Sequence, residues 1–182
     1  MRLDLVERAR GGDREAFGRL AAGEIQRLLP IARLILRDPD LAEDAVQEAL
    51  VRCWRQLPKL REVERFDAWL YRILIRAAAD EFARRRRHQA SIQALSTEPS
   101  GGDTAAGVAD RDQLERGFRR LSIDHRTIVV LHHYAGLPLP EAAAVLGSPV
   151  GTAQSRYHYA MAARRASLEA EGRKPAAGEV PA

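Results

Sequence analysis

The sequence has one cysteine, few aromatic residues and no long apolar run. Because Cys53 is alone, neither an internal disulfide nor a zinc site built from several cysteines can form. Aromatic side chains make up only 5% of the 182 residues, which favours helices over strands. The longest aliphatic run, residues 128–131, is far too short to span a bilayer, and the charged first residues lack the apolar stretch of a signal peptide. We therefore expect a cytoplasmic, all-α protein without membrane insertion.

Catalytic motifs are also missing. The chain has no Gly-rich phosphate loop, no cluster of metal ligands and no plausible pair of nucleophile and base. His132 and His133 are adjacent on a predicted helix, so their side chains point about 100° apart. They lack carboxylate or thiolate partners at ligand spacing, and we interpret them as packed or solvated side chains. We expect no enzymatic activity, no metal and no cofactor.

Helix-forming residues, chiefly Ala, Leu, Arg and Glu, fall into two blocks. Residues 1–90 predict consecutive helices, and residues 111–171 predict a second helical domain. Residues 91–110 are rich in Ser, Thr, Gly and Pro and have no hydrophobic periodicity, which is typical of a flexible linker. Residues 172–182, rich in Pro, Gly and Ala, predict a disordered tail. The predicted fold is two helical domains joined by a linker.

Capping residues mark helix boundaries in the first block. Asp13 follows two glycines and can cap the next helix. At Asp38-Pro39-Asp40 we expect Pro39 to end one helix and an Asp to cap the helix that follows.

Residues 40–57 predict an amphipathic helix whose polar face carries both signs of charge. Asp44, Glu48 and Arg52 recur at every fourth position and so share one side of the helix, with Gln47 beside them. Glu48 and Arg52 can form an i,i+4 ion pair. Such a face is either simply solvated or a docking surface for another protein.

Residues 66–87 predict a long helix that is apolar at its start and ends in a basic cluster. Its arginines are Arg72, Arg76, Arg84, Arg85, Arg86 and Arg87. Cations near the negative C-terminus of a helix are one explanation for them. Four consecutive arginines exceed that requirement, so the pattern also indicates a strip that follows a phosphate backbone.

Residues 139–147 predict a short helix ended by Gly147, and a tight turn leads into a second helix. We expect Ser148 to cap the second helix, with Pro149 at its first position. Hydrogen-bonding side chains lie near the N-terminus of that helix, the end that enters the major groove in a helix-turn-helix. They are Thr152, Gln154, Ser155, Arg156, His158 and Tyr159. An ordinary helical hairpin with a solvated face would give the same local pattern.

Together these segments resemble the sigma-70 family of bacterial transcription initiation factors, in particular its compact extracytoplasmic-function (ECF) branch. Residues 40–48, continuing to Arg52 and Trp54, are similar to the helix that binds core RNA polymerase. Residues 66–73, with Asp80 and the arginine run, are similar to the helix that contacts the −10 promoter element. Residues 136–147 and the helix after them are similar to the helix-turn-helix that contacts the −35 element.

The resemblance implies a role for each set of residues. Asp44, Gln47, Glu48 and Arg52 would contact the clamp helices of the largest polymerase subunit. Residues 60–66 would form the loop that captures a flipped −10 base. Arg72, Arg76 and the four consecutive arginines would hold the promoter backbone, and the listed side chains of the second helix would contact the −35 element. The implied partners are core RNA polymerase, promoter DNA and an anti-sigma protein.

One alternative is a free-standing helix-turn-helix regulator, which would bind DNA without polymerase. The carboxylates Asp44 and Glu48 argue against it, because an acidic face repels DNA.

Overall fold

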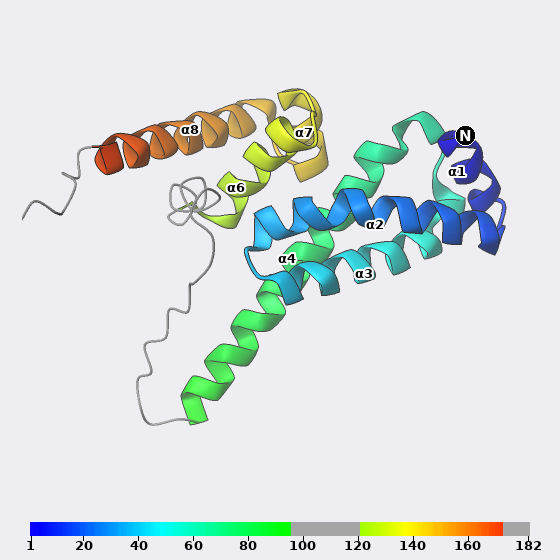
Figure 1. The fold of residues 1–182 in the computed structure, drawn as a ribbon, viewed down its shortest axis with the longest axis horizontal. Coiled ribbons are helices and arrows are strands. Elements are labelled where there is room, and N and C mark those ends of the chain that lie inside the picture. Colours follow the sequence, from blue (N-terminus) through cyan, green and yellow to red (C-terminus); the bar gives the residue numbers. More distant parts are fainter. Residues whose placement is uncertain (96–120, 173–182) are drawn as a thin grey trace, which may run out of the picture.

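The computed structural model describes the backbone of residues 1–95 and 121–172 and the side chains of residues 1–92 and 121–165. In these ranges the chain is helical and contains no strand, which confirms the predicted all-α class (Figure 1). The α-helices are α1 (Arg2–Arg10), α2 (Arg14–Leu36), α3 (Pro39–Gln56), α4 (Phe66–Leu95), α6 (Ile123–Val129), α7 (Leu139–Leu146) and α8 (Val150–Gly172). Shorter turns are the 3₁₀ segments η1 (Leu57–Lys59) and η2 (Val63–Arg65) and the π-helical η3 (Val130–Tyr134).

Helices α1 to α4 form the first domain. Helix α3 packs against both α2 and α4, and α4 crosses the α2–α3 pair (Figure 1). The core is made of apolar side chains from these three helices, chiefly Leu28, Ile31, Ile35, Cys53, Phe66, Leu70 and Leu74. Cys53 is 1% exposed, and burial raises the pKa of its thiol to about 12.

Two aspartates start the long helices of this domain. A side-chain oxygen of Asp13 accepts a hydrogen bond of 2.9 Å from the backbone N–H of Ala16, which confirms the predicted cap of α2. Asp38 accepts hydrogen bonds of 3.1 Å from the N–H groups of Asp40 and Leu41 and so caps α3. These bonds satisfy N–H groups that have no partner inside the helix.

The end of α2 differs from the prediction. Helix α2 stops at Leu36, and Arg37 adopts the left-handed conformation with φ 59°. Pro39 is instead the first residue of α3, where its missing N–H costs nothing. The reversal of the chain therefore comes from Arg37, and the proline begins a helix rather than ending one.

Helix α4 is longer than predicted. It continues to Leu95, because none of residues 89–95 is a glycine or a proline. It therefore extends through residues 91–95, which were assigned to the linker. The four consecutive arginines consequently lie in the body of the helix, so complementing its C-terminus does not explain them. The rest of the predicted linker and the predicted tail from residue 173 onward lie outside the described residues.

Helices α6, α7 and α8 form the second domain, around a core of Ile128, Leu131, Ala142, Val145, Ala153 and Ala160. Helix α7 ends at Gly147, which has φ 64°. The N–H of Gly147 donates to the carbonyl of Ala144 at 3.2 Å, and the N–H of Ser148 donates to that of Ala143 at 3.0 Å. This pair of bonds is a Schellman motif, and it sets the sharp turn between α7 and α8.

The predicted cap of α8 is wrong by one residue. Helix α8 begins at Val150, and the carbonyl of Pro149 accepts from the N–H of Ala153 at 3.1 Å. Pro149 therefore precedes the helix. The hydroxyl of Ser148 is buried without a hydrogen-bond partner in the described part of the chain. Because the backbone of Ser148 closes the Schellman motif, the helix starts one residue later than the sequence pattern predicts.

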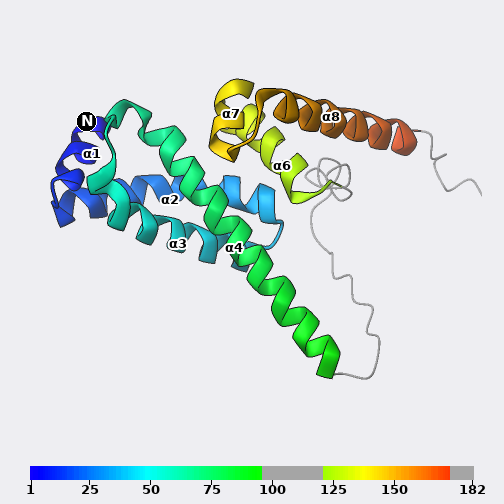
Figure 2. The same ribbon diagram turned by 180° about the vertical axis from the view of Figure 1, so that it is seen from behind.

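The two domains are in contact. Helix α7 packs against α4, and α6 and η3 pack against α2, so that one apolar cluster runs through both domains (Figure 1 and Figure 2). Arg126 of α6 is 8% exposed. Burial lowers the pKa of its guanidinium, and the nearby charge of Arg37 lowers it further. Among the described helices, none is sufficiently long and apolar for a membrane span.

Candidate functional surfaces

The predicted polymerase-binding residues lie on the solvent side of α3. The side chains of Asp44, Glu48 and Arg52 are 55%, 38% and 28% exposed, and Gln47 is exposed as well. The Nε of Arg52 donates to Oε1 of Glu48 at 2.7 Å, and its Nη1 donates to Oδ2 of Asp80 on α4 at 2.7 Å. These two hydrogen bonds raise the pKa of Arg52, the bond to Glu48 most strongly. The arrangement presents carboxylates at fixed positions on a rigid helix.

The predicted −10 arginines are all exposed on α4, but some of them face carboxylates. Arg84 forms ion pairs with Glu81 and, at 3.7 Å, with Asp44 of α3. Arg85 lies 3.9 Å from the carboxylate of Asp38. Asp44 and Asp38 are 55% and 30% exposed, so the contacts with them contribute little to stability and can be exchanged for another anion. Glu81 is only 9% exposed and holds Arg84 in a less solvated pair.

The connection from α3 to α4 alternates buried and exposed residues. Leu60, Val63 and Phe66 are 8%, 6% and 2% exposed and anchor the segment to the core. The side chains between them point to solvent, namely Arg61, Glu62, Glu64 and Arg65. We call residues 60–66 the 60–66 loop. It presents polar side chains on a backbone fixed at three points.

The predicted −35 residues lie along the first turns of α8. Thr152, Gln154, Ser155, His158 and Tyr159 are exposed. Arg156 is half-buried, and its guanidinium pairs with the carboxylate of Asp124 on α6 at 3.0 Å. Tyr159 lies against His125 with 4.7 Å between ring centroids. The exposed end of α8 thus offers hydrogen-bonding groups at the helix terminus that a major groove admits.

Comparison with known proteins identifies both domains. The model described as Sigma-70 region 2 matches residues 21–88, and the model described as Sigma-70, region 4 matches residues 111–163. The RNA polymerase sigma-H factor of Pseudomonas aeruginosa is 32% identical over 165 residues, which cover 84% of this chain and 86% of that protein. The chain belongs to the sigma-70 family. The resemblance seen in the sequence is thereby confirmed.

Further similarities place this sigma factor in the ECF branch. It is 30% identical over 145 residues to the ECF RNA polymerase sigma factor SigM of Mycobacterium tuberculosis, with 80% of this chain and 73% of that protein covered. The solved structure of CnrH in complex with the cytosolic domain of CnrY matches with a TM-score of 0.67 and 28% identity, over 92% of this chain and 97% of that one. RpoE of Bartonella quintana, solved with the anti-sigma factor NepR, matches with a TM-score of 0.65 and 25% identity, over 81% of this chain and 96% of that one.

The adjacent histidines of the sigma factor fit the prediction of packed or solvated side chains, since His132 is half-buried and His133 is exposed. Nδ1 of His132 lies 2.8 Å from the carbonyl oxygen of Leu137. Nε2 of His133 lies 3.0 Å from the hydroxyl of Tyr157, whose ring also packs edge-on against His132. These contacts join η3 to α8, the second helix of the helix-turn-helix.

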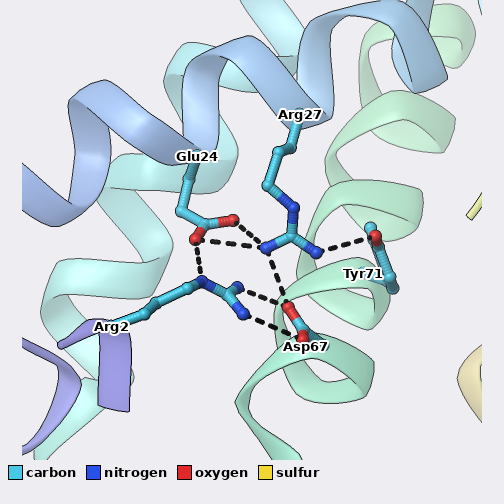
Figure 3. A network of polar contacts seen from close by, with 5 residues as sticks. All are labelled: Arg2, Glu24, Arg27, Asp67 and Tyr71. Atoms are coloured by element: carbon cyan, nitrogen blue, oxygen red, sulfur yellow. Dashed lines mark hydrogen bonds and ion pairs between the residues drawn. The ribbon is translucent and has the colours of Figure 1, made fainter. Parts of the chain in front are cut away.

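A polar network of the sigma factor was not predicted from the sequence (Figure 3). Glu24 has a side chain only 3% exposed and accepts from Arg2 at 2.8 Å and from Arg27 at 2.9 Å. Arg2 and Arg27 also donate to Asp67, at 2.9 Å and 3.0 Å, and Arg27 donates to the hydroxyl of Tyr71 at 3.3 Å. The hydrogen bond from Arg2 is the largest cause of the lowered pKa of Asp67. The network joins α1, α2 and the first turn of α4.

Proposed function

We propose that this ECF sigma factor acts in the cytoplasm, binds core RNA polymerase and directs it to promoters through −10 and −35 elements, without any covalent step. The observation that carries the proposal is the division of surfaces. Helix α3 carries carboxylates beside Arg52, α4 carries arginines, and α8 of the other domain carries mostly neutral hydrogen-bonding groups beside Arg156. Each surface is suited to a different partner.

The α3 face is the polymerase surface. Asp44, Gln47, Glu48 and Arg52 form a compact patch with both signs of charge, in which two carboxylates and one amide lie close together. Patterned charge of this kind favours a specific protein partner, and its acidic members disfavour DNA. The partner is the clamp-helix region of the largest polymerase subunit, by the resemblance described above.

The α4 face and the 60–66 loop are the −10 surface. Arg72, Arg76 and the consecutive arginines Arg84, Arg85, Arg86 and Arg87 supply cations along one long helix, as binding to a phosphate backbone requires. The loop lies at the start of the same helix and holds exposed polar side chains on anchored backbone. A base extruded from the duplex would be captured there, so that the opened state of the promoter is favoured.

The exposed end of α8 is the −35 surface. Thr152, Gln154 and Ser155 project from its first turns, and Arg156, His158 and Tyr159 follow. Hydrogen bonds from such groups to base edges distinguish sequences in the major groove. Because both domains would be held on one polymerase, the second DNA contact is effectively intramolecular, and the combined affinity exceeds that of either part.

An anti-sigma protein is the proposed regulator. CnrH is solved in complex with the cytosolic domain of CnrY, and RpoE is solved in complex with the anti-sigma factor NepR. This chain matches both sigma partners over more than four fifths of its length. A protein of the same class would occlude the surfaces on α3 and α8 until a signal releases it.

Run-off transcription tests the proposed function. Purified chain and core polymerase are incubated with a library of promoter fragments, and transcripts are sequenced. The proposal requires initiation at fragments that share two spaced elements and no initiation by core enzyme alone. A folded chain that binds DNA but is not retained by core polymerase would instead support the free-standing regulator.

A further inference from the structure

Helix α1 lies outside the segment that the family model matches, which begins at residue 21. It nevertheless packs into the first domain, with Val6 fully buried and Ala9 1% exposed. Besides α2, it contacts η1, which precedes the 60–66 loop, and η2, which lies within the loop. Helix α1, which precedes the segment matched by the region 2 family model, therefore packs against the loop.

The loop backbone is extended where α1 reaches it. Leu60 has φ −68° and ψ 116°, and Glu62 has φ −116° and ψ 104°. Carbonyl groups in such a stretch have no helical partner and need another donor or water. Nη1 of Arg10, the last residue of α1, lies 3.3 Å from the carbonyl oxygen of Leu60 and 3.5 Å from that of Arg61, and donates to both.

The N-terminal end of α1 contacts the C-terminal end of the loop. Arg2 donates to Asp67 in the first turn of α4, and its guanidinium lies 5.5 Å from the centre of the Phe66 ring. Glu24 holds Arg2 in place from α2 (Figure 3). The two arginines at the ends of α1 thus contact both ends of the 60–66 loop.

We propose that Arg10 is a positioning residue for base capture, which it supports by holding the backbone of the 60–66 loop in the shape that receives the base. This inference rests on the proposed function of the loop. Pulling a base out of the stack is costly, and a site that is already ordered loses less entropy when it accepts the base. Arg10 orders the two residues at the start of the loop and leaves the exposed side chain of Arg61 free to face the DNA, whereas that of Leu60 is buried in the core.

The test compares holoenzymes assembled from core polymerase and the full chain, either wild type or Arg10→Ala. The probe is a fork DNA whose non-template strand is single-stranded across the −10 element. Each −10 nucleotide is replaced in turn by an abasic one, and the ratio of intact to abasic affinity is taken at the position where the wild type is most sensitive. We expect Arg10→Ala to reduce this ratio by about fivefold, the effect of losing one hydrogen bond.

Arg8→Ala is the matched control, because Arg8 lies on the same helix but pairs with Asp13 at 2.7 Å. We expect its ratio to equal that of the wild type, and we expect Arg10→Lys, which keeps a donor, to recover part of the loss. Equal melting temperatures for Arg8→Ala and Arg10→Ala would separate positioning from general stability.

Two outcomes contradict the inference in different ways. An unchanged ratio in Arg10→Ala, or an equal reduction in Arg8→Ala, overturns the role of Arg10 and leaves the proposed function intact. A wild-type holoenzyme without any abasic-sensitive position overturns base capture by the loop, and the role of Arg10 with it.

Discussion

Arg156 on α8 forms an ion pair with Asp124 on α6, with 3.0 Å between its Nη2 and the carboxylate. The side chain proposed to contact the −35 element is therefore engaged within its own domain before DNA arrives. The side chain of Arg156 is 30% exposed, and that of Asp124 is 56% exposed. Solvated pairs of this kind are worth at most about 1 kcal/mol, so DNA can displace the carboxylate.

Arg156→Ala should weaken binding to a −35 duplex by about 1–3 kcal/mol if the guanidinium contacts a base edge. Asp124→Asn should act in the opposite direction, because it frees Arg156 and removes a negative charge near the DNA. Fluorescence anisotropy with cognate and scrambled duplexes measures both variants. A loss that is equal on the two duplexes would make Arg156 a phosphate contact.

Glu48→Lys should abolish association with core polymerase while leaving the helix content unchanged. The substitution reverses the charge of the α3 patch and places a second cation beside Arg52, its present partner. Glu43→Lys is the control, since Glu43 is an exposed residue of the same helix that pairs with Arg33 at 3.0 Å. Pull-down with core enzyme and circular dichroism give the result. Retention of Glu48→Lys at the wild-type level would count against the docking surface.

Asp67→Asn should reduce the fall in the free energy of unfolding that occurs as the pH is lowered from 6 to 2. The hydrogen bond from Arg2 lowers the pKa of Asp67 below its usual value of 3.8, so the folded state favours the ionised carboxylate. That contribution is complete above pH 3.8, the pKa of the unfolded chain, and disappears as the pH falls through the lower pKa of the folded state. Urea unfolding of both proteins from pH 6 to pH 2 measures it. Parallel curves over this range would show that Asp67 does not contribute.

Ser148→Ala should leave the stability unchanged or raise it by up to about 1 kcal/mol, because it removes a buried hydroxyl that has no hydrogen-bond partner among the residues that the structure describes. If Ser148 capped α8, the same substitution would instead cost about 1 kcal/mol. Thermal unfolding of the two proteins therefore decides between the observed turn and the one predicted from the sequence. Gly147→Ala is a useful contrast and should be destabilising, because Gly147 has φ 64°.

The features that were predicted correctly are those that depend on residues close together in the sequence. The cap at Asp13 and the glycine stop at Gly147 depend on a few neighbouring residues, so the sequence pattern is enough. The polar side chains of α3 and α8 could be located on their helices for the same reason, since helical periodicity fixes which residues share a face.

Features that depend on distant residues were missed. The network of Arg2, Glu24, Arg27 and Asp67 joins positions up to 65 residues apart, and nothing in the sequence indicates that α1 packs beside the start of α4. The length of α4 was missed for a different and local reason, because residues 83–92 of this helix are exposed. The residues after His88 are compatible with a helix, and the change in composition that marks a linker begins later than the end of α4.

The buried Cys53 makes the protein convenient for site-directed labelling. Thiol reagents attack the thiolate, and a group that is 1% exposed with a pKa of about 12 is scarcely ionised near neutral pH. A second cysteine introduced at Val51, which is 43% exposed, would therefore react with a maleimide dye far faster than the native one. Fluorophores could then be attached to either domain in an otherwise unchanged chain, and the distance between the domains could be followed as polymerase binds.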